Sequence, residues 1–137
     1  MLLRLRKHPS SLYLGRAMHP LVTVDGRTHQ LPWGDNHLAV SDDVPVELMI
    51  HVPNTDTRSF RRTIGAVACT VPAGRRRAVE YTAPAFGSAP GEIGPLGTTR
   101  ARGVRRKVAF LAVLGLMTVI VLLGVVSVIW AGATGQL

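Results

Sequence analysis

The spacing of apolar residues divides the chain into a long part with alternating pattern and a short, continuously apolar part. Within residues 44–52, Val46, Leu48 and Ile50 fall on one side of an extended chain and Glu47 falls on the other. This period of two residues is typical of a strand with one buried face, and it excludes an amphipathic helix. The alternating part therefore predicts β structure.

Further short extended runs precede and follow this strand. An Asp25-Gly26 pair between two such runs is a strong signal for a tight hairpin. Val79 and Tyr81 alternate with polar residues and are expected to face inward. The predicted strands besides 44–52 lie in 22–29, 64–71 and 78–82, with weaker candidates at 11–14 and 38–40. Together they predict a mainly β protein with a small antiparallel β-sandwich-like domain over residues 1–82.

Few large aromatic residues are available to fill so small a core. The sequence supplies Tyr13, Trp33, Phe60 and Tyr81, and we expect all four to contribute to it. A small core gives modest stability, so a partner that reinforces the domain is an expectation.

The apolar part is residues 108–131. Of these 24 residues, 20 are apolar and none is charged. At about 1.5 Å per residue a helix of this length reaches roughly 36 Å, enough to cross a hydrocarbon core of about 30 Å. We predict one C-terminal transmembrane helix, with Trp130 as an interfacial aromatic and residues 132–137 as a short external tail.

Charge is concentrated just before this helix. The net charge is +8, from 16 basic and 8 acidic residues. Five of the basic residues lie immediately before the apolar run: Arg100, Arg102, Arg105, Arg106 and Lys107. The positive-inside rule then predicts a tail-anchored, single-pass protein of the plasma membrane, with its N-terminal domain cytoplasmic and its C-terminus outside. The rule has exceptions, so the reverse orientation stays open.

Between the domain and the helix, residues 83–107 have the composition of a linker. Three prolines and five glycines fall within positions 83–103, and such a segment breaks helices and strands alike. We predict a Gly/Pro-rich linker that ends in the basic juxtamembrane stretch.

The strand order predicts where two further arginine clusters lie. If strands 44–52, 64–71 and 78–82 alternate in direction, the 53–63 loop and the start of the linker share one end of the domain. The expected membrane-surface residues are therefore Arg58, Arg61, Arg62, Arg100, Arg102, Arg105, Arg106 and Lys107. An anionic leaflet attracts each such cation by about 1 kcal/mol. The 72–76 turn falls at the opposite end.

Residues that could contact a protein partner are fewer. The candidates are Trp33 and the turn arginines Arg75, Arg76 and Arg77. The other interpretation of Trp33, which we favour, is a core residue that caps one end of the sandwich.

Motifs for catalysis or metal binding are missing from the sequence. The five histidines have neither helical i,i+4 spacing nor an HExxH pattern, and the single Cys69 lies in an apolar alternation. Phosphate loops and a G-x-S-x-G elbow are absent as well. We therefore predict no catalytic, metal or cofactor residues, no cofactor, and no small-molecule substrate. Without aromatic platforms among the arginines, nucleic acid is not an expected partner.

Short turn-dominated motifs carry a resemblance to a known group. Val22-Thr23-Val24-Asp25-Gly26, Trp33-Gly34, Val71-Pro72-Ala73-Gly74 and Val79-Glu80-Tyr81-Thr82-Ala83-Pro84 are similar to segments of small actinobacterial single-pass membrane proteins. The domain pattern also resembles PEGA-type β modules. The stretch 41–45 departs from that pattern, because it lacks the usual turn glycine. The resemblance implies a β domain, a Gly/Pro-rich linker and a C-terminal anchor, and it implies no catalytic activity.

These observations favour a non-catalytic, membrane-anchored interaction module. The expected role is an accessory or scaffold subunit of a larger membrane protein complex, with a protein partner. One alternative is a module that binds anionic lipid while tethered by its own helix. A small enzyme is a further, disfavoured alternative.

Overall fold

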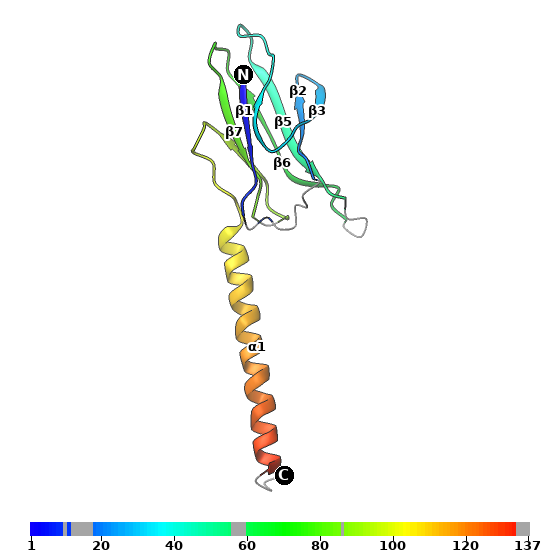
Figure 1. The fold of residues 1–137 in the computed structure, drawn as a ribbon, viewed down its shortest axis with the longest axis vertical. Coiled ribbons are helices and arrows are strands. Elements are labelled where there is room, and N and C mark those ends of the chain that lie inside the picture. Colours follow the sequence, from blue (N-terminus) through cyan, green and yellow to red (C-terminus); the bar gives the residue numbers. More distant parts are fainter. Residues whose placement is uncertain (10, 12–17, 56–59, 86, 134–137) are drawn as a thin grey trace. The chain divides into compact units, whose positions relative to one another are not determined.

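The computed structural model describes residues 1–9, 11, 18–55, 60–85 and 87–133, apart from the side chains of residues 106 and 131–133. The chain divides into two units, Met1–Val104 and Arg105–Leu137. The first unit is built of strands, and the second belongs to a single helix (Figure 1). The predicted fold class, a mainly β domain followed by one C-terminal apolar helix, is confirmed.

The described strands form two four-stranded sheets. Sheet A has the order β4 (Gly34–His37), β1 (Leu2–Arg6), β7 (Ala78–Thr82) and β8 (Glu92–Gly94). Sheet B has the order β3 (Arg27–Gln30), β2 (Leu21–Val24), β5 (Val46–Pro53) and β6 (Thr63–Val71). The two sheets face each other as the layers of a sandwich (Figure 1).

Alternation in β5 determines which of its faces meets the core. Val46, Leu48 and Ile50 are buried, whereas Glu47 and Met49 are exposed. Burial of one such aliphatic side chain contributes about 1.5–3 kcal/mol. The pattern therefore fixes the register, because a shift by one residue would expose the apolar set.

The opposite layer contributes its own inward residues. Leu3 and Leu5 of β1 and Val79 and Tyr81 of β7 join the same buried cluster as the β5 side chains. The Tyr81 hydroxyl donates a hydrogen bond of 2.9 Å to the Gly65 carbonyl oxygen, which satisfies its polar end inside the core. The predicted inward orientation of Val79 and Tyr81 is confirmed.

The hairpin predicted at the Asp-Gly pair is present. Asp25 and Gly26 have φ values of 45° and 82°, and β2 and β3 pair on either side of them. Two successive positive φ values define the tight hairpin turn that matches the twist of the flanking strands. Glycine accommodates such a φ without steric cost, and aspartate is among the few residues that tolerate it.

Three strands of sheet A, β1, β4 and β8, were not predicted. β1 runs parallel to β7, so the sandwich is not wholly antiparallel. β4 consists of Gly, Asp, Asn and His, and these residue types do not favour strands. The segment is extended because it pairs with β1. The weaker candidate at 38–40 forms no strand, while most of the candidate at 11–14 lies outside the described residues.

The aromatic contribution to the core differs from the prediction. Tyr81 is buried and Trp33 packs against the core cluster. Phe60 was expected in the core, and this expectation is wrong, because its side chain is fully exposed. The cause is its position outside β6, which begins only at Thr63. Tyr13 lies outside the described residues.

The proline- and glycine-rich segment packs onto the domain. Residues Ala83 and Ala85 are fully buried, and β8 pairs with β7 from within the segment expected to break strands. A Cβ atom added to Gly91 would lie 2.4 Å from a ring carbon of Tyr81. Glycine is required here because the backbone comes so close to the ring, so composition does not make this segment structureless.

The helix α1 comprises Val104–Ala133. Its span Lys107–Trp130, 24 residues, is long and apolar enough to cross a membrane. Side chains from Val108 to Trp130 are exposed to the surroundings. Lipid is the environment in which such a surface is favourable, because in water it would be left unburied.

Candidate functional site

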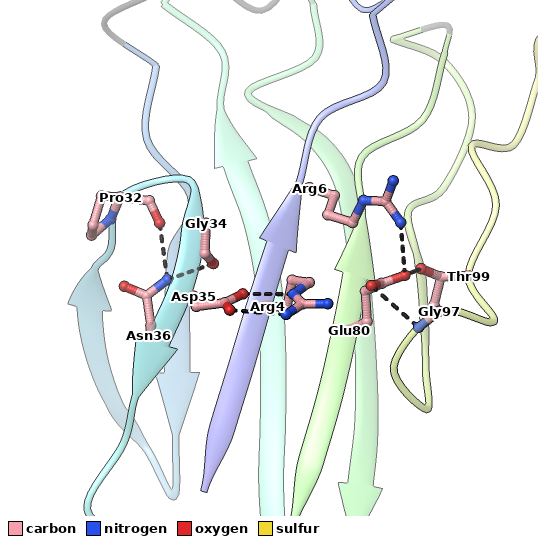
Figure 2. A network of polar contacts seen from close by, with 9 residues as sticks. All are labelled: Arg4, Arg6, Pro32, Gly34, Asp35, Asn36, Glu80, Gly97 and Thr99. Carbon is pink, nitrogen blue, oxygen red and sulfur yellow. Dashed lines mark hydrogen bonds and ion pairs between the residues drawn. The ribbon is translucent and has the colours of Figure 1, made fainter.

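The outer face of sheet A has a ladder of charged side chains. Because Leu3 and Leu5 face the core, Arg4 and Arg6 of β1 project from the opposite face. The register places Arg4 beside Asp35 of β4 on one side and Glu80 of β7 on the other. Figure 2 shows how these side chains lie across the three strands.

Arg4 and Asp35 form a two-bond ion pair at the exposed edge of this ladder. The Arg4 Nε and Nη2 atoms donate to the two carboxylate oxygens of Asp35 at 2.6 and 2.9 Å. These hydrogen bonds lower the pKa of Asp35 and raise the pKa of Arg4. Both side chains are solvent-exposed, so the pair fixes geometry more than it contributes to stability.

Glu80 is the buried member of the ladder. Its side chain has no solvent-exposed surface. Its carboxylate accepts hydrogen bonds from the Thr99 hydroxyl at 2.5 Å, the Gly97 amide at 3.3 Å and Arg6 at 3.5 Å. Burial by itself raises the pKa of Glu80, but the bonds from Thr99 and Gly97 and the charge of Arg6 outweigh it, so the pKa lies below its ordinary value.

These bonds attach the chain that precedes the helix to sheet A. Thr99 also shares a hydrogen bond of 2.7 Å with the Thr82 hydroxyl. Further along, the Ala85 amide donates to the Arg102 carbonyl oxygen at 2.9 Å. We call Glu80, Thr82, Gly97 and Thr99 the Glu80 clamp. It holds the last residues of the domain in a defined place.

The end of the domain from which the chain leaves can be identified from its contacts. The Arg61 guanidinium donates to the Ser88 carbonyl oxygen at 2.9 Å, and Ala85 bonds to Arg102. The 53–63 loop and the chain exit therefore share one end, which we call the exit end. This placement agrees with the arrangement predicted from alternating strand directions.

Several cationic and aromatic side chains project at the exit end. Phe60, Arg61 and Arg62 are exposed in the loop. Arg100 and Arg102 are both exposed, and Arg102 is paired with Glu92 at 3.3 Å. Arg58 and the side chain of Arg106 lie outside the described residues.

Trp33 also lies toward the exit end, because Gly34 pairs with Leu5 near the end of β1. Its indole nitrogen donates to the Met18 carbonyl oxygen at 2.7 Å, and the Lys7 ammonium lies 6.0 Å from the ring centroid. The ring is half-buried against the core cluster. These contacts fit the alternative in which Trp33 caps one end of the sandwich.

The three turn arginines of the opposite end do not behave alike. Arg75 and Arg76 are exposed. Arg77 is buried, with 8% of its surface exposed, and donates to the Gly74 carbonyl oxygen at 2.9 Å and the Ser41 carbonyl oxygen at 2.5 Å. Its guanidinium thus fixes the 72–76 turn against a neighbouring loop.

Within the helical unit, the remaining predicted residues lie on α1. Arg105 is exposed and Lys107 is half-buried, both in the first turns of the helix. Trp130 is exposed at the far end of the span. This arrangement has cations at one end of the apolar stretch and an indole at the other.

The described residues include few groups that could act in catalysis or hold a metal ion. In this part of the chain, no cluster of three or more His, Cys, Asp or Glu side chains is placed to hold a metal ion. Cys69 is half-buried, and burial raises the pKa of its thiol, which keeps it in the less nucleophilic form.

Sequence reasoning missed two of these features. Glu80 was part of a strand pattern, but its partners Gly97 and Thr99 follow 17 and 19 residues later, beyond the range of local periodicity. Phe60 was assigned to the core because it is aromatic. Its two arginine neighbours, Arg61 and Arg62, were a signal that this position belongs to a surface loop.

Comparisons of the chain with protein-family models, with curated proteins and with solved structures found no match.

Proposed function

We propose that this protein is a non-catalytic, membrane-anchored interaction module, an accessory or scaffold subunit of a larger membrane protein complex. The observation that carries the proposal is the span Lys107–Trp130, which is long and apolar enough to cross a membrane and is exposed, in a chain whose β domain has a core of its own. An exposed apolar surface of this length requires lipid or protein around it. The domain needs no help from the helix to bury its apolar side chains.

The proposed topology has the domain in the cytoplasm and the C-terminus outside. Five cations precede the apolar span, and residues 132–137 carry no charged side chain. Basic flanks are retained on the cytoplasmic side during insertion. Reporter fusions at the two termini test this orientation, and an active periplasmic or extracellular reporter at the N-terminus contradicts it.

The Glu80 clamp suits such a role, because it limits the freedom of the chain between domain and anchor. Thr99 and Arg102 are bonded to the domain shortly before α1 begins at Val104, so little of the glycine-rich chain is left unattached.

The test is purification of the intact protein in mild detergent. A protein partner that copurifies in fixed stoichiometry, and survives exchange into a second mild detergent, supports the subunit role. The subunit role is contradicted if the protein stays monomeric, no protein copurifies with it, and its only binding is to added anionic lipid.

A second candidate function is binding of an anionic lipid surface by the exit end. The observation that favours it is the exposed Phe60 beside Arg61 and Arg62, at the end from which the chain leaves the domain. An aromatic ring flanked by cations suits the headgroup region, where the ring enters the interface and the cations meet phosphates.

Flotation of residues 1–107 with vesicles tests this function. Vesicles with phosphatidylglycerol are compared with neutral vesicles, for the wild-type fragment and for Phe60→Ser. Lipid binding predicts flotation with anionic vesicles only, reduced by the substitution. Equal flotation with both kinds of vesicle refutes it. Circular dichroism of the fragment serves as the control for folding.

A further inference from the structure

The four edges of the two sheets are very unequal. β3 has four residues, all polar or charged, and β4 has four, of which all but Gly34 are polar or charged. β8 has only three residues. β6 is an edge strand of nine residues, Thr63–Val71, without a charge or a proline. Natural proteins usually protect long edges with charges, prolines or short length. β6 has a register irregularity opposite Ile50 and Val52, and its Gly65 end is covered by the Tyr81 hydroxyl and by Gly91. The half that contains Ala68 and Thr70 has no such protection among the described residues.

The bonds of Glu47 determine which backbone groups of β6 are free. The backbone C=O of Glu47 accepts a hydrogen bond from the Asp25 amide, and its backbone N–H donates to the Asp25 carboxylate. Both backbone groups of Glu47 therefore point toward β2. The backbone N–H and C=O groups of successive residues in a strand point toward opposite neighbouring strands. Those of Leu48 therefore point toward β6, where Cys69 is its partner. The N–H and C=O groups of Ala68 and Thr70 must then point away from β5.

Within the described part of the chain, β6 pairs with β5 alone. Ala68 and Thr70 have no backbone hydrogen bond to any other segment there. Their outward groups form a template that only another extended chain can satisfy in register. The chemistry of this edge therefore points to a polypeptide strand as its occupant.

A pocket adjoins the free half of this edge. It has a volume of about 480 Å³ and lies between β6 and β8, the two edge strands on that side of the sandwich. Its lining is mostly apolar, with Val71, Pro72 and Ile93 among the residues that contribute. A side chain from a strand added to β6 could enter it, because alternate residues of that strand face the pocket.

The charged residues of the lining are both cationic: Arg76 and Arg77. Arg76 is exposed. The Nη1 atom of the buried Arg77 has no hydrogen-bond partner among the described residues, although its other nitrogens are bonded. Asp42 and Asp43 belong to the neighbouring loop and do not line the pocket. The Nη1 atom is shielded from solvent, so the cation that a ligand can reach is Arg76, and this side chain makes the pocket complementary to a carboxylate.

We propose that the β6 edge and this pocket bind an extended segment of a partner protein, with an apolar residue in the pocket and an acidic residue beside Arg76. This inference rests on the proposed function and names the chemistry of the partner. Backbone bonds to Ala68 and Thr70 supply affinity, and the pocket with its arginines supplies selectivity.

The experiment uses the intact protein in mild detergent and a random library of nonapeptides as the probe. Peptides enriched on the wild-type protein are compared with those enriched on Ala68→Pro. Proline removes the outward N–H of residue 68 and leaves the ladder to β5 intact, because that N–H has no partner in β5. Ala68→Ser keeps the N–H and is the matched control. Thr70→Pro is the second blocking variant if Ala68→Pro does not fold.

We expect enriched peptides to alternate apolar residues and to contain aspartate or glutamate. Their dissociation constant should rise by at least about tenfold in Ala68→Pro and change less than about twofold in Ala68→Ser. Arg76→Glu should weaken binding of the acidic peptide and strengthen binding of its lysine-substituted counterpart. Near-UV circular dichroism and the thermal midpoint establish that each variant is folded.

Enrichment that is equal on both proteins, or enrichment of basic peptides, overturns the inference. Sedimentation of the protein alone provides another outcome: a dimer broken by Ala68→Pro shows that the occupant is a second copy of this chain, which also overturns it. A copurifying partner that is retained by both blocking variants overturns this docking surface but leaves the proposed function standing. Absence of any partner refutes the proposed function instead.

Discussion

Replacement of Glu80 by glutamine tests whether the clamp holds the pre-helix segment on the domain. The side chain keeps its size, so packing is preserved. The amide oxygen can still accept from the Thr99 hydroxyl, but the amide nitrogen replaces the oxygen that accepts from the Gly97 N–H at 3.3 Å. Two donors then face each other in a place without solvent, and Arg6 loses its counter-charge.

The magnitude follows from what is lost. A hydrogen bond to a charged group contributes about 1.5–3 kcal/mol, and an unsatisfied buried donor costs a similar amount. Relief from burying a charge offsets part of this loss. We expect Glu80→Gln to lower the free energy of unfolding by about 2 kcal/mol, which lowers the melting temperature of a domain of this size by roughly 8 °C.

The assay is thermal unfolding of the intact protein in mild detergent, followed by near-UV circular dichroism. Asp35→Asn is the matched control, because Asp35 belongs to the same ladder but is solvent-exposed. It should change the midpoint far less. If Glu80→Gln and Asp35→Asn have equal effects, the clamp does not stabilise the domain and the reasoning is refuted.

The pH dependence of the same pair of proteins gives an independent check. Because the pKa of Glu80 lies below its ordinary value of about 4.5, the stability it contributes is present above that value and is lost as the pH falls through the folded-state pKa. The difference in the free energy of unfolding between wild type and Glu80→Gln should therefore be constant near neutral pH and should shrink as the pH falls into the acid range. A difference that grows in acid contradicts this sign.

Three further predictions concern packing and the exit end. Gly91→Ala should destabilise the domain by about 1–3 kcal/mol, because the new Cβ would lie 2.4 Å from the Tyr81 ring; a denaturant midpoint like that of wild type would show that this segment is not packed there. Ile50→Ala should cost about 2–5 kcal/mol in the same measurement, since Ile50 is fully buried in the core. Phe60→Ala should leave that midpoint unchanged, because the ring is fully exposed; a clear loss of stability would restore Phe60 to the core.

The predictable part of the fold is the part encoded by local periodicity. Val46, Leu48 and Ile50 alternate with polar residues, so the faces of β5 follow from their spacing. The Asp25-Gly26 turn follows from the φ values that these residues tolerate. The length and polarity of Lys107–Trp130 determine the helix without reference to any other segment.

Other features depend on partners far away in sequence. Gly34–His37 is a strand only because β1 pairs with it, and β1 pairs with β7 more than 70 residues later. The burial of Glu80 is decided by Gly97 and Thr99, which lie in a segment whose composition suggested a loose linker. Local patterns carry no information about such contacts.

For the candidate surfaces, the sequence predicts at which end of the domain an arginine lies but not whether its side chain is buried. Placement of Arg61 and Arg102 at one end follows from strand directions, and the structure has them there. The buried Arg77 differs from its exposed neighbour Arg76 because carbonyl oxygens of Gly74 and Ser41 capture its guanidinium. Three consecutive arginines in the sequence give no sign of this difference.

Whether α1 crosses lipid is tested most directly by washing native membranes that contain the intact protein with alkaline carbonate. The apolar side chains of the span Lys107–Trp130 are exposed in the protein itself, and the proposed anchor buries them in the hydrocarbon core of the bilayer. The protein should therefore remain in the membrane pellet. Its release into the supernatant would contradict the anchor, and with it the proposed function.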